Sequence, residues 1–571
     1  MPCRARRRRT FVRRASGRFR PRDLWFWSAR ESPGAISSDE ETLNFPLLSR
    51  VLGIICLLIG GSMAFSLPFA FPLLANRTHL PAASEIETGG IFGLLFSMAI
   101  SLLIGLLLLL AGRRGRAAHL FRKEAMAIVG LSWVLATVLG ALPYYLSGTE
   151  IADGRSMTFI EAMFESQSGF STTGATVLTD LESPSSVPHC ILFWRSSTHF
   201  LGGLGIVVLF VAILGQGSAG KAMVRAEMPG PSKEGSMPRM QHTALVFAGI
   251  YGGLNAILTA IYMFEGMTFF DALCHAFGTM ATGGFSTYNR SLGGFDSPLI
   301  EYTTILFMIL AGTNFTLLYL TMVGGPKKLF GDVEFQTYVG IIAVMTGGIL
   351  FFGMRAENVG FDSLASGFRN SLFQVVSIMT TTGYGTADFD QWNNFARGSL
   401  LVLMFIGGCA GSTGGGLKVI RHVLFYKVLL HEIELVYRPR VVRLIRIGGN
   451  IADDPSMLRG IMVYFCLILG IFIGSWMLLV TFEPSSTWGF LPDSPQAVDS
   501  NTLDEKLLDC ASAVAATLNN IGPGLGVVGA TQNYAGFSQG AKFLFVWLMM
   551  LGRVEVFSVL VLVFPTFWRR S

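Results

Sequence analysis

The segment Thr380-Thr381-Thr382-Gly383-Tyr384-Gly385 (TTTGYG) ends a short apolar stretch that lies between two long hydrophobic runs. Three other segments share its glycine-centred pattern: STTGAT at 171–176, ATGGFS at 281–286 and NNIGPG at 519–524. Glycine lets a backbone turn its carbonyl groups toward an axis, and a ring of such carbonyls can replace the water around a cation. Four such loops in one chain therefore predict a single pore with four-fold pseudo-symmetry.

The composition places the chain in a membrane. Of its 571 residues, 51% are hydrophobic and 14% are charged, whereas soluble domains carry about 25% charged residues. A helix needs roughly 20 apolar residues to cross a bilayer. Ten ranges reach that length and make an all-α polytopic membrane protein the predicted class: 47–74, 89–111, 125–147, 189–214, 242–264, 298–323, 336–354, 397–424, 457–481 and 540–567.

The positive charge is concentrated at the N-terminus, where residues 1–30 hold eleven arginines and one acid, Asp23. Such an arm can bind nucleic acid or anionic lipid, but it is more often a disordered cytosolic tail or a segment upstream of the true start, and we assign residues 1–44 no function. The seven cysteines lack the spacing of a zinc site or a disulfide framework. The chain also lacks GxSxG, HExxH and Walker A motifs. We therefore predict neither an enzyme nor a bound cofactor.

The distribution of charge between the apolar ranges predicts the orientation. Basic residues gather at 113–123, 221–239, 327–328 and 421–446, and these segments alternate with acidic ones that contain Glu85, Asp180 and Glu483. Cytoplasmic loops of membrane proteins carry the excess of Lys and Arg. With ten spans, this pattern places both termini in the cytosol and an acidic vestibule outside, where it would raise the local concentration of cations.

Each of the four loops lies in a module of long span, short amphipathic stretch, loop and second long span. A polar residue precedes the central glycine of each loop by thirteen positions, and these residues are Glu161, Asp271, Asn370 and Asp509. The same spacing selects Gly284, rather than Gly283, as the central glycine of the second loop. The short stretches fit re-entrant half-helices whose ends line a water-filled path. The predicted domains are a tail (1–44), an N-terminal helix pair (45–112) and four pore repeats (125–215, 240–324, 335–446 and 455–568).

Several long strings resemble the TrkH-type potassium uptake proteins of the Trk/Ktr/HKT superfamily. They are EAMFESQSGFSTTGAT at 161–176, WRSSTHFLGGLGI at 194–206, FFDALCHAFGTMATGGFST at 269–287, FQVVSIMTTTGYGTADF at 373–389, GGCAGSTGGGLKVIRH at 407–422 and ATLNNIGPGLG at 516–526. The resemblance covers about residues 45–571 and implies a potassium filter made mostly of backbone carbonyls. Carried over position by position, the filter residues are Thr172, Thr173, Gly174, Thr282, Gly283, Gly284, Thr381, Thr382, Gly383, Asn520, Ile521 and Gly522.

A glycine-rich segment, 407–416, interrupts the apolar range 397–424. Each glycine costs a helix about 1 kcal/mol relative to alanine, so its six glycines oppose a continuous helix, and broken helices at mid-membrane border permeation paths. Close helix packing through small residues is the alternative. The resemblance implies an intramembrane gate formed by Gly407, Gly408, Gly411, Ser412, Thr413, Gly414, Gly415 and Gly416, with Lys418 at its edge.

Arg553 lies in the middle of the last apolar range. An arginine at the centre of a membrane helix is disfavoured by at least about 2.5 kcal/mol, so it should face the pore or a partner rather than lipid. The resemblance implies an electrostatic barrier below the filter, and an ion pair with a buried acid is the alternative. Arg195 lies near the end of its own range, where it could extend to the membrane surface, and receives no functional assignment.

The resemblance also implies the partners and the place of the protein. We expect a homodimer in the bacterial cytoplasmic membrane that binds a cytosolic TrkA-type nucleotide-binding subunit through the basic segments 216–241 and 421–446. Nucleotide is expected on that partner only, potassium is the expected substrate, and nucleic acid is not an expected ligand. The alternatives are the pore subunit of an ATP-driven potassium pump and a proton- or sodium-coupled symporter.

Overall fold

A computed structural model describes residues 43–80, 85–114, 122–151, 154–205, 240–355, 361, 363–439, 446–447, 450–451, 455–488, 500–554 and 556–568. Nearly all of the predicted tail, most of the basic segment 216–241 and Glu555 lie outside these ranges. The described residues are mostly helical with almost no strands, which confirms the predicted all-α class. Its few strands are two-residue pairs, β1 (Glu150–Ile151) with β2 (Arg155–Ser156) and β3 (Arg446–Ile447) with β4 (Asn450–Ile451).

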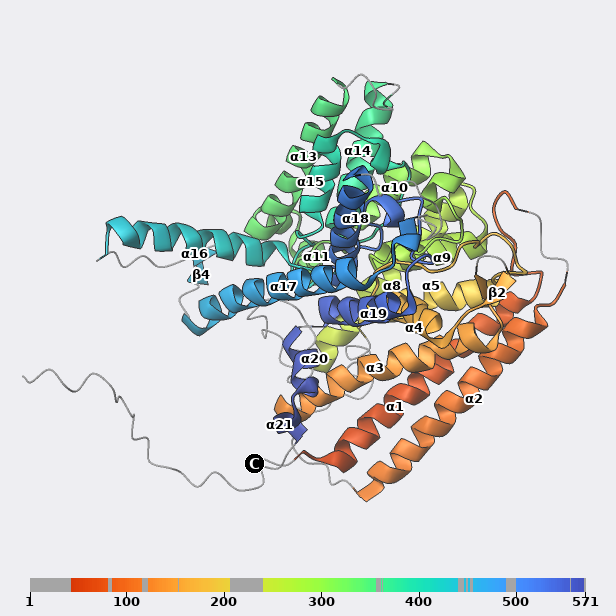
Figure 1. Cartoon of the computed structure of the whole chain (residues 1–571). Helices are drawn as coiled ribbons and strands as arrows, with labels where there is room; N and C mark the ends of the chain where they lie inside the picture. The colour runs from red at the N-terminus through yellow and green to blue at the C-terminus, as the bar shows by residue number, and fades with distance from the viewer. Residues whose placement is uncertain are drawn as a thin grey trace, which may run out of the picture. The chain divides into compact units, whose positions relative to one another are not determined.

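The first three long helices pack side by side (Figure 1). Helix α1 (Phe45–Met63) continues into a 3-10 turn, η1 (Ala64–Ala70), and its Gly53 and Gly60 approach α2 (Thr88–Ala111) closely. A Cβ atom at Gly53 would lie 2.8 Å from the carbonyl oxygen of Gly105. Small residues let membrane helices approach in this way, and α3 (Arg122–Leu146) completes the layer.

The rest of the chain repeats one arrangement, in which a helix of 12 to 19 residues, called a short helix below, packs between the helix that precedes it and the helix that follows it. The four short helices are α4 (Phe159–Phe170), α9 (Phe269–Met280), α14 (Leu364–Met379) and α18 (Ser500–Leu518). The preceding helices are α3, α8 (Met240–Phe264), α13 (Val333–Gly353) and α17 (Pro455–Phe482), and the following helices are α5 (His189–Leu204), α10 (Pro298–Ala311), α15 (Asn394–Leu403) and α19 (Gln539–Arg553). Successive repeats also contact one another. Helix α5 of the first repeat packs against α9 of the second, and α10 of the second packs against α14 of the third. Helix α19 of the fourth repeat packs against α4 of the first.

The expected number of continuous spans is wrong for the described residues, in which six helices are long and apolar enough to cross a membrane. A seventh span results if α10 and α11 (Phe315–Gly324), which bend by 98° at the break between them, are counted as one. The range 397–424 divides into α15, the glycine-rich segment and α16 (Val419–Tyr437), and the range 540–567 divides into α19, α20 (Val556–Val563) and part of α21 (Pro565–Trp568). The range 189–214 contains α5, which ends at Leu204, and residues 206–214 lie outside the described ranges.

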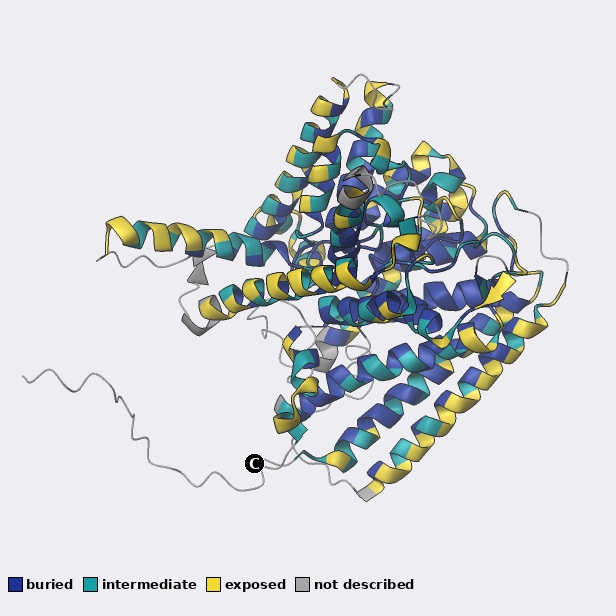
Figure 2. Cartoon of the chain, viewed as in Figure 1, coloured by how far each residue is buried: buried dark blue, intermediate teal, exposed yellow. Residues whose placement is uncertain are grey.

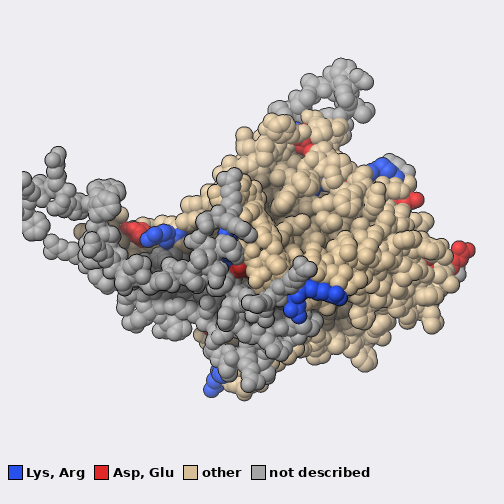
Figure 3. All heavy atoms as spheres, turned by 90° about the horizontal axis from the view of Figure 1, so that it is seen from below, with Lys and Arg blue, Asp and Glu red and all other residues tan. Residues whose placement is uncertain are grey.

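The outer helices expose apolar side chains, as expected of a surface that faces lipid. Figure 2 shows exposed residues along α2 and α17, and only 22% of the apolar window of each of these helices is buried. On the face shown in Figure 3, Lys, Arg, Asp and Glu side chains of the described residues are few and far apart. A soluble protein does not expose so large an apolar area.

Side-chain caps fix where the short helices begin. Thr158 accepts from the backbone of Glu161, whose carboxylate accepts in return, and Thr268 caps α9 in a similar way. Two of the four polar residues thirteen positions before the central glycines, Glu161 and Asp271, therefore lie in the first turn of α4 and α9, respectively. Helix α14 begins earlier, after its cap Ser363, and α18 begins at Ser500, so Asn370 and Asp509 lie inside their helices rather than at the start.

Candidate functional site

The four predicted loops, which we call loops one to four (171–176, 281–286, 380–385 and 519–524), share one backbone conformation. In each, the second residue has a positive φ of 53° to 57° although it carries a side chain, and the central glycine has a φ of 76° to 97°. The N–H before that glycine donates to the short helix, as in Thr173 N to Ser168 O at 2.9 Å and Thr382 N to Ser377 O at 2.8 Å. Left-handed threonine is unfavourable, so the packing imposes this turn on loops one, two and three, whereas loop four places Asn520 there, a residue type that adopts the conformation more readily.

The four loops form a closed ring in the order of the chain. A Cβ atom at Gly174 would lie 2.2 Å from the carbonyl oxygen of Gly283, and one at Gly284 would lie 2.0 Å from that of Thr382. A Cβ atom at Gly383 would lie 1.9 Å from the oxygen of Ile521, and one at Gly522 would lie 2.6 Å from the oxygen of Thr173. Each central glycine thus abuts the carbonyl that precedes the central glycine of the next loop. The twelve predicted filter residues all belong to this ring, and they are Thr172, Thr173, Gly174, Thr282, Gly283, Gly284, Thr381, Thr382, Gly383, Asn520, Ile521 and Gly522.

A hollow lined by all four central glycines lies at one mouth of the ring. Beside it, a carboxylate oxygen of Asp390 accepts from the N–H of Gly526 at 3.1 Å and lies 4.0 Å from Nε of Arg397. Burial raises the pKa of Asp390 to about 6, against these stabilising contacts. In the described residues no group of three His, Cys, Asp or Glu side chains is placed to bind a metal. The ring supplies backbone oxygens, the ligands that potassium filters use.

Tyr384, the aromatic residue of loop three, braces loop two. Its hydroxyl donates to the carbonyl of Phe285 at 3.3 Å and to that of His275 at 3.2 Å. Gly278 makes room for this hydroxyl, because a Cβ atom at position 278 would lie 2.2 Å from it. The tyrosine of the TTTGYG segment therefore holds a neighbouring loop in place.

The glycine-rich segment 407–416 is a loop that lies against the helix end of the ring. The N–H of Gly415 donates to the hydroxyl of Thr381 at 2.8 Å, and Gly416 approaches the carbonyl of Asn519. The other side of the segment is fixed at the bend between α10 and α11, where Cys409 N donates to Gly312 O at 2.8 Å. Of the predicted gate residues, the structure thus brings Gly414, Gly415 and Gly416 beside loops three and four. Gly408, Gly411 and Thr413 lie instead against the bend between α10 and α11, and Gly407 and Ser412 connect these two parts of the segment.

Two buried charged side chains hold this loop. The ammonium group of Lys418 donates to the carbonyls of Gly414 and Gly415, the latter at 3.2 Å. Glu334, on α13, accepts from the N–H of Ala410 at 2.7 Å and from that of Ile420 at 3.2 Å. Glu334 was not among the residues predicted from the sequence, although an acid in the first turn of an apolar helix was a usable signal.

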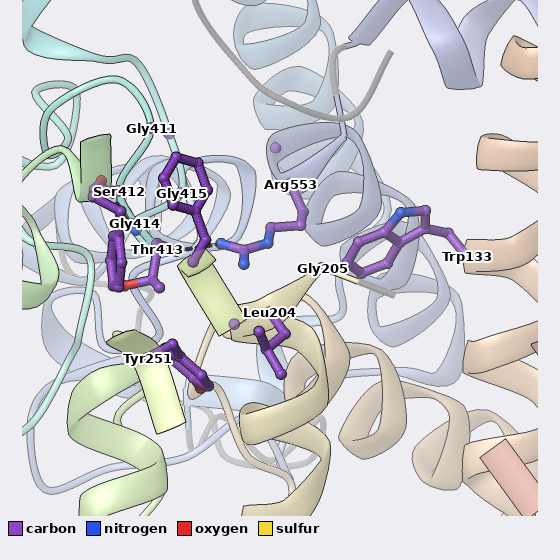
Figure 4. Close-up of a pocket in the computed structure, with 15 residues that line it drawn as sticks. Trp133, Leu204, Gly205, Tyr251, Gly411, Ser412, Thr413, Gly414, Gly415 and Arg553 are labelled. Atoms are coloured by element: carbon purple, nitrogen blue, oxygen red, sulfur yellow. Dashed lines mark hydrogen bonds between the residues drawn. The ribbon is translucent and has the colours of Figure 1, made fainter. Parts of the chain in front are cut away.

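Arg553 is the last residue of α19, not the middle of a continuous span, because Val554 has extended backbone. Its guanidinium group donates to the carbonyl of Thr413 at 2.5 Å and to that of Gly202, near the end of α5, at 2.7 Å. Figure 4 shows the side chain extending toward the glycine-rich loop across a cavity that Trp133 also lines. A cation at a helix carboxyl end is electrostatically favourable. Arg553 therefore links α19, α5 and the glycine-rich loop.

The Arg195 side chain, which the sequence leaves free to extend to the membrane surface, does not do so. It is buried, and its Nε lies 2.6 Å from a carboxylate oxygen of Glu165, which is also buried. Glu165 belongs to the short stretch before loop one and Arg195 to the next apolar range, and the two positions are 30 residues apart, so no local pattern reveals the pair.

Comparisons with known proteins agree on one family. A family model described as "TrkH: Cation transport protein" matches residues 95–487. The chain is 36% identical to "Trk system potassium uptake protein TrkH" of Salmonella typhimurium over 92% of this chain and 100% of that protein. It is 32% identical to "Trk system potassium uptake protein TrkG" of Escherichia coli over 78% of this chain and 86% of that protein. The crystal structure of the potassium transporter TrkH from Vibrio parahaemolyticus superposes with a TM-score of 0.75 at 31% identity, covering 92% of this chain and all of that one.

Proposed function

Because the chain belongs to the TrkH family of cation transport proteins, we propose that it takes up potassium through the ring of loops one to four. It is a multi-pass protein of the inner membrane, since its relatives are Trk potassium uptake proteins and its apolar helices are long enough to cross a bilayer. The observation that carries the proposal is the closed ring of central glycines, each against a carbonyl of the next loop. Carbonyl rings of this kind replace the hydration shell of a potassium ion.

The glycine-rich loop is the proposed gate. It lies between the ring and the cavity that Arg553 lines, and its contacts with Lys418 and Glu334 give it a defined closed position. Movement of the glycine-rich loop away from the ring would open the path, and it would require the contacts with Thr381, Lys418 and Glu334 to break. Arg553 adds a positive charge to the same path and so repels an ion that enters the cavity.

The protein works as a homodimer under the control of a cytosolic TrkA-type nucleotide-binding subunit, with both termini in the cytosol. The relatives' names, which refer to a Trk system, support a multi-component assembly. On the described residues, α16 offers exposed apolar side chains, among them Leu430, Ile433 and Val436, that a partner could cover. No observation favours a subunit of an ATP-driven pump.

Rubidium uptake by purified protein in liposomes tests the pore. Gly383→Ser places a side chain on a backbone with φ of 79° and against the oxygen of Ile521, so it should abolish uptake. Gly347→Ser is the matched control, because position 347 has open space around a Cβ atom and lies on an exposed helix face. Equal uptake by both variants would reject the ring as the path.

The same liposomes separate passive transport from coupled transport. Downhill uptake without an imposed proton or sodium gradient identifies a gated channel. Uptake only in the presence of such a gradient identifies a symporter and leaves the assignment of the ring intact, because Gly383→Ser should then abolish the coupled flux.

A further inference from the structure

Two buried arginines hold consecutive backbone carbonyls just beyond the central glycine of loop two. Arg195 donates to the carbonyl of Ser286 at 2.9 Å, and Arg77 donates to the carbonyl of Thr287. The side chains are 2% and 5% exposed, respectively, although each carries a full charge. Buried charges are costly unless they are paired or fully hydrogen-bonded, so both positions need an explanation.

Arg195 connects loop two to loop one. Its Nε lies 2.6 Å from Glu165 of α4, and the same carboxylate accepts from the hydroxyl of Thr176 at 2.9 Å and from the N–H of Val177 at 3.1 Å. The guanidinium group also lies 3.5 Å from the ring centre of Phe285, in loop two. One ion pair therefore fixes the chain just after the central glycine in both loops.

Arg77 makes a second connection between the same two segments. One guanidinium nitrogen donates to the carbonyl of Leu181 at 2.8 Å, and another donates to that of Thr287. Thr78 supports this position, because its N–H donates to Asp271 of α9 at 2.6 Å and its hydroxyl accepts from Thr268 N at 2.9 Å. Arg77 lies between η1 and α2, so the N-terminal helices, which precede the four repeats, supply it.

These contacts determine which backbone carbonyl oxygens of the loop-two segment remain free to bind an ion, because the carbonyls of Ser286 and Thr287 already accept from an arginine. A carbonyl oxygen that accepts from a guanidinium group is held in one direction and is a poor ligand for a second cation. Ser286, Leu181 and Arg195 all line the hollow outside the ring. On loop two, an ion that enters from this hollow would therefore meet its first free carbonyl oxygens at the ring itself.

We propose that Arg77 and Arg195 are positioning residues that set the ion selectivity of the pore by fixing loop two against loop one. The inference rests on the proposed function of the ring as the filter. A filter selects potassium only if its oxygens keep their spacing, so loops that can move apart or together should accept sodium as well.

The test measures rubidium and sodium uptake by purified full-length variants in liposomes. Arg77→Gln removes one connection. The double variant Glu165→Gln/Arg195→Gln removes the other without leaving an unpaired buried charge. Each should lower the ratio of rubidium to sodium uptake by about tenfold, the effect of losing about 1.4 kcal/mol of discrimination.

Two matched controls carry the same charge changes away from the ring. Arg290→Gln removes a positive charge from the exposed end of the segment that follows loop two. Glu301→Gln/Arg369→Gln removes an ion pair of 2.9 Å that joins α10 to α14. Neither control should change the uptake ratio.

The outcomes separate the two proposals. If Gly383→Ser abolishes uptake but folded variants of Arg77 and Arg195 keep the wild-type ratio, the positioning role is wrong and the filter stands. If Gly383→Ser leaves uptake and ratio unchanged, the filter itself is wrong. Should the glutamine variants fail to fold, Arg77→Lys and Arg195→Lys decide. These variants keep the charge but lose the forked geometry, so a lowered ratio supports the proposal and an unchanged ratio overturns it.

Discussion

Replacing Arg553 by alanine should raise cation flux through the protein. The guanidinium nitrogen lies 2.5 Å from the carbonyl oxygen of Thr413, so an ion that passes on the far side of this oxygen would lie about 5 Å from the charge. Two unit charges at about 5 Å repel by about 3 kcal/mol at an effective dielectric constant of about 20. This repulsion corresponds to at most about a hundredfold in rate, and we expect a rise of at least about fivefold because other barriers remain.

The two hydrogen bonds of Arg553 provide a second route to the same result. Its links to Thr413 and Gly202 hold the glycine-rich loop against α5, and each bond from a charged donor contributes about 1.5 to 3 kcal/mol. Arg553→Lys separates the two effects, because lysine keeps the charge but cannot form the fork. A barrier that is purely electrostatic predicts wild-type flux for lysine and high flux for alanine, whereas a tether predicts raised flux for both variants.

The assay is the initial rate of rubidium uptake into liposomes that contain purified protein without any regulatory subunit. Arg438→Ala serves as the control, since the Arg438 side chain is exposed at the end of α16 and is 65% accessible. Both variants must reconstitute to the same protein density, which is measured by immunoblot. Unchanged or lower uptake by Arg553→Ala would refute both the barrier and the tether.

Three further results should follow from the site. The pKa of Asp390 in the folded protein is raised to about 6 from 3.8. The protonated carboxyl therefore stabilises the fold below pH 3.8, and this contribution is lost as the pH rises to about 6. The melting temperature should fall between about pH 4 and 6 for this reason, and Asp390→Asn should reduce that fall. Lys418→Met should raise basal rubidium uptake by up to about tenfold, because it releases the two glycine-rich loop carbonyls that the ammonium group holds. Gly278→Ala should reduce uptake, since the new methyl group would meet the hydroxyl of Tyr384. Tyr384→Phe in the same chain should relieve this contact but restore uptake only in part, because it also removes the hydroxyl that supports the Phe285 carbonyl of loop two.

The parts of the fold that could be predicted from the sequence are those with a local signal. Apolar runs of membrane length identified helices such as α2 and α17, and the glycine pattern located all four loops of the ring. A pattern of hydrophobicity does not show where a run bends. The range 298–323 looks continuous, but Asn314 caps α11 by accepting from Thr316 N and Leu317 N, so the helix restarts there at 98° to α10.

The contacts of the candidate site depended on pairs that are far apart in the chain. Glu165 and Arg195 are 30 residues apart, and Arg77 donates to a carbonyl 210 residues away. Neither residue type nor spacing reveals such partners, which is why Arg195 received no functional assignment from the sequence. The filter, gate and barrier roles of the ring, the glycine-rich loop and Arg553 stay predictions until the variants are measured.

The four loops show how one backbone conformation can persist while the side chains around it diverge. In loops one and three, the carbonyl after the central glycine accepts from a serine of the short helix, Ser168 at 2.6 Å and Ser377 at 2.7 Å. Loop two has Gly278 at the equivalent place and uses the hydroxyl of Tyr384 from loop three instead. In loop four, Tyr534 donates to the carbonyl of the central glycine itself at 2.7 Å.

This exchange of supports explains the irregular sequences of the loops. An ion that is coordinated by backbone oxygens constrains the positions of those oxygens and not the identity of the side chains behind them. A support can therefore change from a serine on the same short helix to a tyrosine on a neighbouring repeat, provided that a glycine makes room for it. A side chain of loop three supports loop two, so loss of the Tyr384 hydroxyl should disturb loop two more than loop three, which carries this residue. Loss of the Ser168 hydroxyl should act on loop one alone.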